Sequence, residues 1–228
     1  MAVSVLSPFC FQDNLGNLEN CLRRLREQTS PPAQIIVADD SPEEVKPSVE
    51  GLCKGHGAVH LPLPFVDYKP QWAAKYNRAF PLVTGDMVLI LCSNWILEKR
   101  WLEEMVKTLT ALGPKSMVAG DSARKVLLGG DWFAGSPDLF QITNPHLVDE
   151  GFMNLMWAAD WLPWDEEFDR VGAWHAVVEW GHRLMQNEVK VWIRRDLHAE
   201  HQERHPRPEW LSQTQASEGI LRGKGVVV

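Results

Sequence analysis

The sequence lacks the features that define several large classes of protein. It has no apolar run long enough to cross a bilayer. It lacks the basic N-terminal region and the long apolar segment that would predict a signal peptide. It also lacks a block of lysine and arginine, and its formal net charge of -7 disfavours nucleic acid as a partner. A local basic cleft on an acidic protein is still compatible with these numbers. We expect a cytoplasmic protein with no membrane span.

Cysteine is scarce and scattered. The four cysteines show no CxxC spacing, so they indicate reduced thiols in a cytosolic protein rather than a disulfide framework or a zinc site. Internal repeats and low-complexity tracts are also missing. What remains is a chain of 228 residues, 45% of them hydrophobic, which suits one sizeable domain or two halves that share a core.

The first forty residues predict a strand–helix–strand unit. Residues 3–6 form a short apolar run that ends at Ser7-Pro8, and residues 14–28 carry apolar side chains at helical spacing. Prolines break this helix, and residues 34–38 form a second run typical of a strand. Such units give a parallel sheet with a right-handed crossover.

Further along, the clearest central strand covers residues 87–92, which are apolar on both faces as in a buried parallel sheet. After residue 206 the tail is polar, and we expect it to be flexible or to fold across a site. The other expected elements are strands at 58–61, 118–120, 125–128 and 189–193, helices within 43–57, 71–83, 98–112, 151–159 and 179–187, and a loop-like stretch over 129–150.

The end of the second strand is the most informative part of the chain. The run Ile35-Ile36-Val37-Ala38 leads directly to Asp39 and Asp40, and Ser41-Pro42 stops the strand. Two acids at the carboxyl end of a buried strand lie where open α/β sheets bind their ligands. Taken alone, the pair is equally well explained as a helix N-cap or an Asx-turn.

The order of the segments around these acids decides between the two explanations. That order is Ser7-Pro8, the helical segment 20–28, Pro31-Pro32, residues 35–41, Asn77-Arg78-Ala79-Phe80, Thr84-Gly85-Asp86 and the strand up to Leu91. It resembles the nucleotide-sugar half of the family 2 glycosyltransferases with the GT-A fold, well over residues 3–110 and traceably to residue 201. The resemblance implies a single α/β domain with a Rossmann-like, mostly parallel central sheet flanked by helices.

The resemblance also implies roles for particular residues. In the family the acid after the second strand binds the base and its ribose, a role that falls here on Asp39 with Asp40 beside it. A carboxylate can accept charge-assisted hydrogen bonds from ribose hydroxyls or a base N–H. Lys75 and Arg78 could face the diphosphate, although a solvated helix face explains each cation alone. The implied nucleotide-sugar site comprises Ser7, Pro8, Asp39, Asp40, Lys75, Asn77, Arg78, Ser93, Asn94 and Arg183.

The chain departs from the family pattern where a metal would bind. The family has Asp-x-Asp after the central strand, and these carboxylates hold Mg²⁺ or Mn²⁺; this chain has Cys92-Ser93-Asn94. Hard divalent cations prefer oxygen ligands, above all carboxylates. Three alternatives follow: Asn94 holds the metal with a later residue such as His201 or His198, positive side chains replace the metal, or the site is dead.

A second departure concerns the general base. The family's Glu-Asp pair falls on Ala176-Val177, ahead of Arg183-Leu184. The remaining candidates are Glu179 and His175, and both types of side chain can deprotonate an acceptor hydroxyl. Each has a structural alternative: Glu179 could form an i,i+4 ion pair with Arg183, and His175 could be an ordinary groove histidine.

We therefore expect an inverting glycosyltransferase that moves a sugar from a nucleoside diphosphate sugar, a UDP-sugar above others, to an acceptor hydroxyl. The alternative is a non-catalytic GT-A domain that binds a nucleotide sugar or a partner protein. The acceptor could be a glycan, a lipid headgroup, a protein or a modified nucleic-acid base. Tryptophans could stack on a sugar or a base, but we expect most of them in the core. These tryptophans are Trp132, Trp157, Trp161, Trp164, Trp174 and Trp180.

We expect the chain to consist of a nucleotide-sugar half (1–95), an acceptor half (96–205) and a C-terminal tail (206–228).

Overall fold

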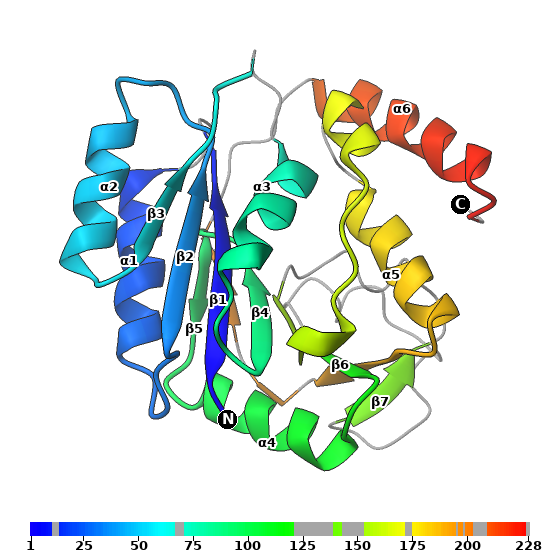
Figure 1. Ribbon diagram of the computed structural model, residues 1–228, viewed down its shortest axis with the longest axis horizontal. Coiled ribbons are helices and arrows are strands. Elements are labelled where there is room, and N and C mark those ends of the chain that lie inside the picture. The colour runs from blue at the N-terminus through cyan, green and yellow to red at the C-terminus, as the bar shows by residue number, and fades with distance from the viewer. Residues whose placement is uncertain are drawn as a thin grey trace.

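The computed structural model describes residues 1–10, 14–66, 71–120, 139–142, 153–171, 175–194, 196–197, 199–202 and 209–226. Its strands are β1 (Val3–Phe9), β2 (Gln34–Asp39), β3 (Val59–Pro62), β4 (Met87–Leu91), β5 (Trp95–Leu97), β6 (Ser116–Gly120), β7 (Leu139–Ile142), β8 (Met153–Trp157), β9 (Lys190–Arg194) and β10 (Ala199–His201). Eight of them form one sheet in the order β3-β2-β1-β4-β8-β6-β9-β7, and β10 pairs with β5. The expected α/β architecture with a mostly parallel central sheet is confirmed (Figure 1).

The structure describes six helices, of which the first three connect the first four strands. These are α1 (Leu15–Arg26), α2 (Lys46–Gly55), α3 (Trp72–Ala79), α4 (Trp101–Leu112), α5 (Ala176–Gln186) and α6 (Glu209–Gly223), with shorter 3-10 turns η1 (Phe80–Leu82), η5 (Ala158–Asp160) and η6 (Glu166–Val171). Strands β1, β2, β3 and β4 pair in parallel, and the strand order steps outward from β1 to β3 and then back to β4. Right-handed crossovers therefore place α1 and α2 on one face and α3 on the other. Figure 1 shows α3 in front of the strands.

Local sequence explains why α1 forms. The Asn14 side chain caps the helix by accepting a hydrogen bond from the Gly16 amide at 2.7 Å. Leu18, Leu22 and Leu25 share the buried face, and basic residues occupy the last turn, where they complement the helix dipole. The helix expected over 14–28 ends two residues earlier, at Arg26.

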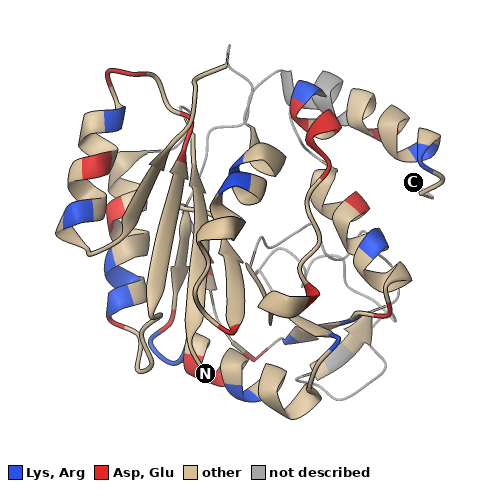
Figure 2. Ribbon diagram, in the orientation of Figure 1, with Lys and Arg blue, Asp and Glu red and all other residues tan. Residues whose placement is uncertain are grey.

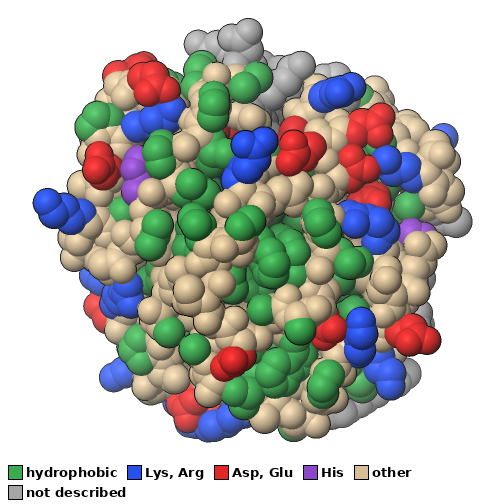
Figure 3. All heavy atoms as spheres, in the orientation of Figure 1, with side chains coloured by type: hydrophobic (Ala, Val, Ile, Leu, Met, Phe, Trp, Pro, Cys, Tyr) green, Lys and Arg blue, Asp and Glu red, His purple; other side chains and the backbone are tan. Residues whose placement is uncertain are grey.

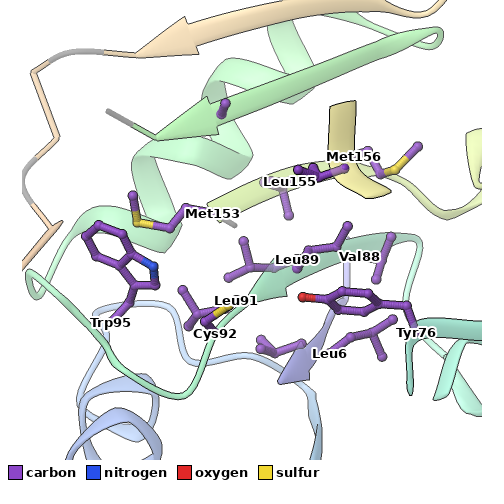
Figure 4. Close-up of a cluster of buried hydrophobic side chains, with 14 of the residues drawn as sticks. Leu6, Tyr76, Val88, Leu89, Leu91, Cys92, Trp95, Met153, Leu155 and Met156 are labelled. Atoms are coloured by element: carbon purple, nitrogen blue, oxygen red, sulfur yellow. The ribbon is translucent and has the colours of Figure 1, made fainter. Parts of the chain in front are cut away.

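Strand β4 is buried along its whole length and lies at the centre of the core. Leu89 and Leu91 contact one layer of side chains and Val88 faces the other, on the side of Tyr76 (Figure 4). Because both faces of the strand are covered, its sequence is apolar without alternation, as expected for a buried parallel strand.

The expected helix over residues 151–159 is wrong. Residues 153–157 form β8, which runs antiparallel between β4 and β6, and a 3-10 turn follows it. Met153, Leu155 and Met156 are all buried, because β8 is covered on both faces (Figure 4). Burial on both faces removes the alternation of apolar and polar residues that distinguishes a strand from a helix. The apolar pattern therefore predicted the wrong element for these residues.

Two other expectations changed. The stretch over 129–150 was expected to be loop-like, but residues 139–142 form β7, which pairs antiparallel with β9. The expected strand at 125–128 lies outside the described residues. In the polar tail, residues 209–223 form α6. In the described part of the chain, no helix combines the length and apolar character that spanning a bilayer requires.

We predict that Gly85→Ala destabilises the protein, because a Cβ at this turn would lie 2.7 Å from the Ala2 carbonyl oxygen and 2.9 Å from the Ser4 nitrogen. Backbone atoms cannot give way cheaply, so the expected loss is about 1–3 kcal/mol of unfolding free energy. Gly51→Ala is the matched control. A Cβ there meets nothing within 4 Å on helix α2, so it should stabilise by about 0.5–1 kcal/mol. Urea denaturation of both variants checks this, and an equal effect of the two would contradict it.

Candidate active site

The candidate site lies at the carboxyl ends of β1, β2 and β4. Strand order reverses at β1, whose two neighbours β2 and β4 are reached by crossovers on opposite faces. Open α/β sheets bind their ligands in the crevice at such a switch point. The strand-end acids, the first turn of α3 and residues 92–94 all belong to this edge. Figure 2 shows acidic residues at the end of β2 and basic residues on α3.

Asp39 is fully buried and both of its carboxylate oxygens are engaged within the fold. Oδ1 accepts a hydrogen bond from the Ser41 amide at 2.8 Å, and Oδ2 lies 2.9 Å from His60 Nε2 on β3. The Ser41 contact is the Asx-type turn that was the structural alternative for this pair. Asp39 is therefore directed toward β3, where it joins the ends of two strands.

Asp40 is directed toward α3 instead. Its Oδ1 lies 2.6 Å from Lys75 Nζ, and its Oδ2 accepts a hydrogen bond from the Gln71 amide at 3.0 Å. Both members of this ion pair are buried, with 2% of the Asp40 side chain and 1% of the Lys75 side chain exposed. Burial raises the pKa of the Asp40 carboxyl, and the positive charge of Lys75 opposes that rise.

Lys75 is a buried cation that the structure places at this edge. Its ammonium lies 5.9 Å from the centre of the Trp72 ring, within the range of a cation–π contact. An ion pair this deeply buried is costly to break, because removing one partner leaves an uncompensated charge. The sequence had placed Lys75 near the diphosphate, and the structure places it against Asp40.

Asp169 is a site residue that sequence reasoning missed. Its two carboxylate oxygens accept hydrogen bonds from the Ala73 and Ala74 amides at 3.0 and 2.9 Å, so it caps the N-terminus of α3. Burial raises the pKa of this carboxyl to about 6, against the lowering effect of the two amides and of Lys75. In the sequence, Asp169 belongs to an acid-rich turn, and this pattern does not predict a contact with α3, which is distant in sequence.

Asn77 and Arg78 have different surroundings. Asn77 Nδ2 donates to the Trp164 carbonyl oxygen at 2.9 Å and to Glu166 at 3.0 Å, while its Oδ1 accepts from the Trp164 amide at 2.7 Å. It therefore fastens the segment before η6 to α3. Arg78 is exposed on the same helix.

Residues 92–94 follow β4 and are all buried. The Asn94 carbonyl oxygen accepts a hydrogen bond from the Gln202 amide at 2.8 Å, and His201 pairs with Trp95 in the small sheet. The backbones of Asn94 and His201 are thus brought close, as a shared metal site would require. Ser7, at the end of β1 beside Pro8, and Ser93 have buried hydroxyl oxygens that make no hydrogen bond within the described structure.

The donor set does not fit a divalent metal. Residues 92–94 offer a thiol, a hydroxyl and an amide, whereas Mg²⁺ and Mn²⁺ prefer carboxylates. Within the described ranges, no three His, Cys, Asp or Glu side chains are grouped so that they could hold a metal ion. His198, the other histidine proposed as a ligand, lies outside those ranges.

Helix α5 carries the two candidates for a general base. Glu179 is buried and accepts hydrogen bonds from Arg183 Nε at 2.6 Å and Nη2 at 2.9 Å, which is the i,i+4 ion pair that was its structural alternative. His175 lies at the N-cap of α5 and is partly exposed, and its Nδ1 lies 2.7 Å from Ser217 Oγ on α6. The structure therefore brings α6 against one candidate and Arg183 against the other.

Aromatic side chains join α3 to α5 on the same face of the sheet. Trp164 stacks on Trp180 with ring centres 5.0 Å apart, and both are buried as expected for core tryptophans. Trp161 is only partly buried and stacks on Phe80 at 4.5 Å. Figure 3 shows hydrophobic side chains gathered in the middle of this face. Trp132 and Trp174 lie outside the described residues.

Comparison with known proteins gives a family match and similar solved structures. A sequence model described as glycosyl transferase family 2 matches residues 4–138, which is more than half of the chain. No curated protein sequence matches.

Similar solved structures include those of S. aureus TarS. The crystal structure of TarS residues 1–349 in complex with UDP has a TM-score of 0.67 at 13% identity over 97% of this chain and 66% of that one. The complex with UDP-GlcNAc has a TM-score of 0.61 at 12% identity over 92% and 60%. A further TarS crystal structure has a TM-score of 0.59 at 14% identity over 97% and 40%. This chain thus spans less than two thirds of these relatives, and the likeness confirms the expected GT-A fold.

We predict that Asp169 makes stability fall as pH rises. Its folded pKa of about 6 exceeds the unfolded value near 3.8, so the folded state holds this proton longer than the unfolded state does. Folding is therefore favoured below pH 4, and this contribution, about 2 kcal/mol, is lost as pH rises through 6. The unfolding free energy of the wild type minus that of Asp169→Asn should decrease by this amount between pH 4 and pH 7 in urea titrations. A difference that is independent of pH would contradict the assignment.

Proposed function

Because this chain belongs to glycosyl transferase family 2, we propose that it transfers a hexose from a UDP-sugar to an acceptor hydroxyl with inversion at the anomeric carbon. The observation that carries this proposal is the family match over residues 4–138, which spans the whole edge formed by β1, β2, α3 and β4. The UDP and UDP-GlcNAc complexes of S. aureus TarS, which shares the fold, support the choice of donor.

The donor site is assigned to the switch point of the sheet. The ends of β1 and β2 contribute Ser7, Pro8 and the acid pair, and α3 contributes Lys75. In this assignment both acids line the site while held by protein partners, Asp39 by His60 and the Ser41 amide on the side of β3 and Asp40 by Lys75 and the Gln71 amide on the side of α3. Residues 1–95 form the nucleotide-sugar half, residues 96–205 the acceptor half and residues 206–228 the tail.

The reaction requires a base on the acceptor side. An acceptor oxygen attacks the anomeric carbon, its proton passes to the base, and the bond from that carbon to the diphosphate breaks with the diphosphate keeping the electron pair. We assign the base to His175. Its bond to Ser217 fixes the ring, and a proton on Nδ1 would leave Nε2 able to accept a proton. Glu179 is less suited because Arg183 occupies both of its oxygens.

The residues that follow β4 are poor ligands for a divalent metal. The family commonly uses a divalent cation, but the residues after β4 do not provide its ligands in this chain. We also propose the cytoplasm as the location of the protein, because its four cysteines are buried and form no disulfide.

We predict that UDP raises the melting temperature of the protein. A ligand that binds only the native state stabilises it by mass action, by about 2.7 kcal/mol at a concentration 100-fold above Kd. Differential scanning fluorimetry with UDP, GDP, ADP and uridine should show the largest shift with UDP. If none of the nucleoside diphosphates shifts the transition, the donor site proposed here is wrong.

A second function is favoured by one specific observation. The positions of the family's Glu-Asp pair hold Ala176 and Val177, both fully buried on α5, so no acid stands there. This supports a non-catalytic domain that binds a nucleotide sugar or a protein partner. Such a domain would bind UDP as above without consuming UDP-sugar.

We predict that His175→Gln abolishes turnover without affecting donor binding. Loss of a general base reduces rates by about 10²–10⁴-fold, so UDP release from UDP-GlcNAc should fall at least 100-fold while the thermal shift with UDP persists. His182→Gln is the matched control, since His182 lies on the same helix and contacts Gln186 at 2.9 Å. Unchanged turnover in His175→Gln would remove His175 from the mechanism. Absence of turnover in the wild type would favour the non-catalytic alternative.

A further inference from the structure

The residues after β4 lack the Asp-x-Asp carboxylates of the family, and this changes how the donor site can stabilise negative charge. A departing nucleoside diphosphate carries negative charge that must be stabilised where it develops. In the family a divalent cation held by Asp-x-Asp supplies this charge. Here the corresponding side chains, Cys92, Ser93 and Asn94, carry no negative charge with which to hold such a cation.

The acids that remain at this edge are already engaged by positive or donor groups. Asp39 binds His60 and the Ser41 amide, and Asp40 binds Lys75 and the Gln71 amide. A metal would have to displace these partners and would meet the ammonium of Lys75. Like charges at short range repel strongly in a buried setting, so the edge disfavours a second cation.

Lys75 supplies positive charge at the same edge. It is buried, so its field is weakly screened by solvent and salt. An ammonium has three donors and is a recognised partner for phosphate as a point charge. The ends of β1 and β4 add the buried hydroxyl groups of Ser7 and Ser93, each without a hydrogen-bond partner among the described residues.

We propose that this chain binds the diphosphate of its donor without a divalent cation, and that the Lys75 ammonium takes the cation's place. The inference rests on the proposed function and specifies its donor site. Lys75 shares its donors between Asp40 and the phosphate oxygens, and Asp40 holds the lysine in position. When the bond from the anomeric carbon to the diphosphate breaks, the electron pair stays on a phosphate oxygen, and Lys75 stabilises that charge.

The experiment compares UDP with uridine by isothermal titration calorimetry, once in EDTA and once in MnCl₂. Uridine lacks the diphosphate, so the ratio of the two dissociation constants isolates its contribution. For the wild type, the Kd for UDP in the two buffers should agree within about threefold. UDP should bind at least tenfold more tightly than uridine in EDTA.

Substitution of Lys75 then tests whether its positive charge binds the diphosphate. Lys75→Met should reduce the preference for UDP over uridine at least tenfold in EDTA. Lys107→Met removes the same charge from the exposed face of α4, where Lys107 pairs with Glu103, and should leave the preference unchanged. Should Lys75→Met fail to fold because Asp40 loses its partner, Lys75→Arg and the wild-type comparison in the two buffers decide. The arginine variant retains the charge and should also bind UDP in EDTA.

The outcomes separate this inference from the proposed function. Binding of UDP only in MnCl₂ would overturn metal independence while leaving a nucleotide-sugar site in place. Equal UDP preference in Lys75→Met and the wild type would overturn the role of Lys75. No binding of UDP in either buffer would overturn both the donor site and the inference built on it.

Discussion

The buried ion pair between Asp40 and Lys75 is the interaction on which the rest of the site depends. It joins the end of β2 to the first turns of α3, and the Gln71 amide adds a second bond to the same carboxylate. Breaking such a pair by removing one partner typically costs 3–5 kcal/mol, because the remaining charge stays buried. The pair therefore fixes α3 over the sheet, and with it every group that α3 carries to the edge.

Helix α3 in turn connects the two halves of the chain. Asp169 caps its first amides, and Asn77 binds the backbone of Trp164, so the segment before α5 is fastened to it at both ends. Tyr76 packs against Trp164 at 4.6 Å, and Trp164 stacks on Trp180 of α5. Glu179 and His175 are thus positioned relative to the strand ends through α3.

The sequence predicted the N-terminal strands well because local patterns were sufficient there. Apolar runs marked β1, β2 and β4, and the strand–helix–strand pattern predicted the parallel pairing of β1 with β2. Residues 153–157 were misassigned as helix because burial on both faces of β8 removed the alternation of a strand. Asp169 escaped notice because its partners, Ala73 and Ala74, are distant in sequence. Pattern reasoning locates elements, but it does not find contacts that the tertiary fold alone creates.

The acid pair shows how one motif can serve two purposes. Asp39 and Asp40 are adjacent in sequence, yet alternation along the strand end sends one carboxylate toward His60 on β3 and the other toward Lys75 on α3. One acid stabilises the sheet edge and the other positions a cation, so two neighbouring carboxylates need not share a ligand. Where carboxylates are absent after β4, a lysine held by an acid can supply positive charge that a metal held by acids would otherwise bring. The net charge offered to a diphosphate then depends on the Asp40–Lys75 pair, and a substitution at either member alters both the fold and the site.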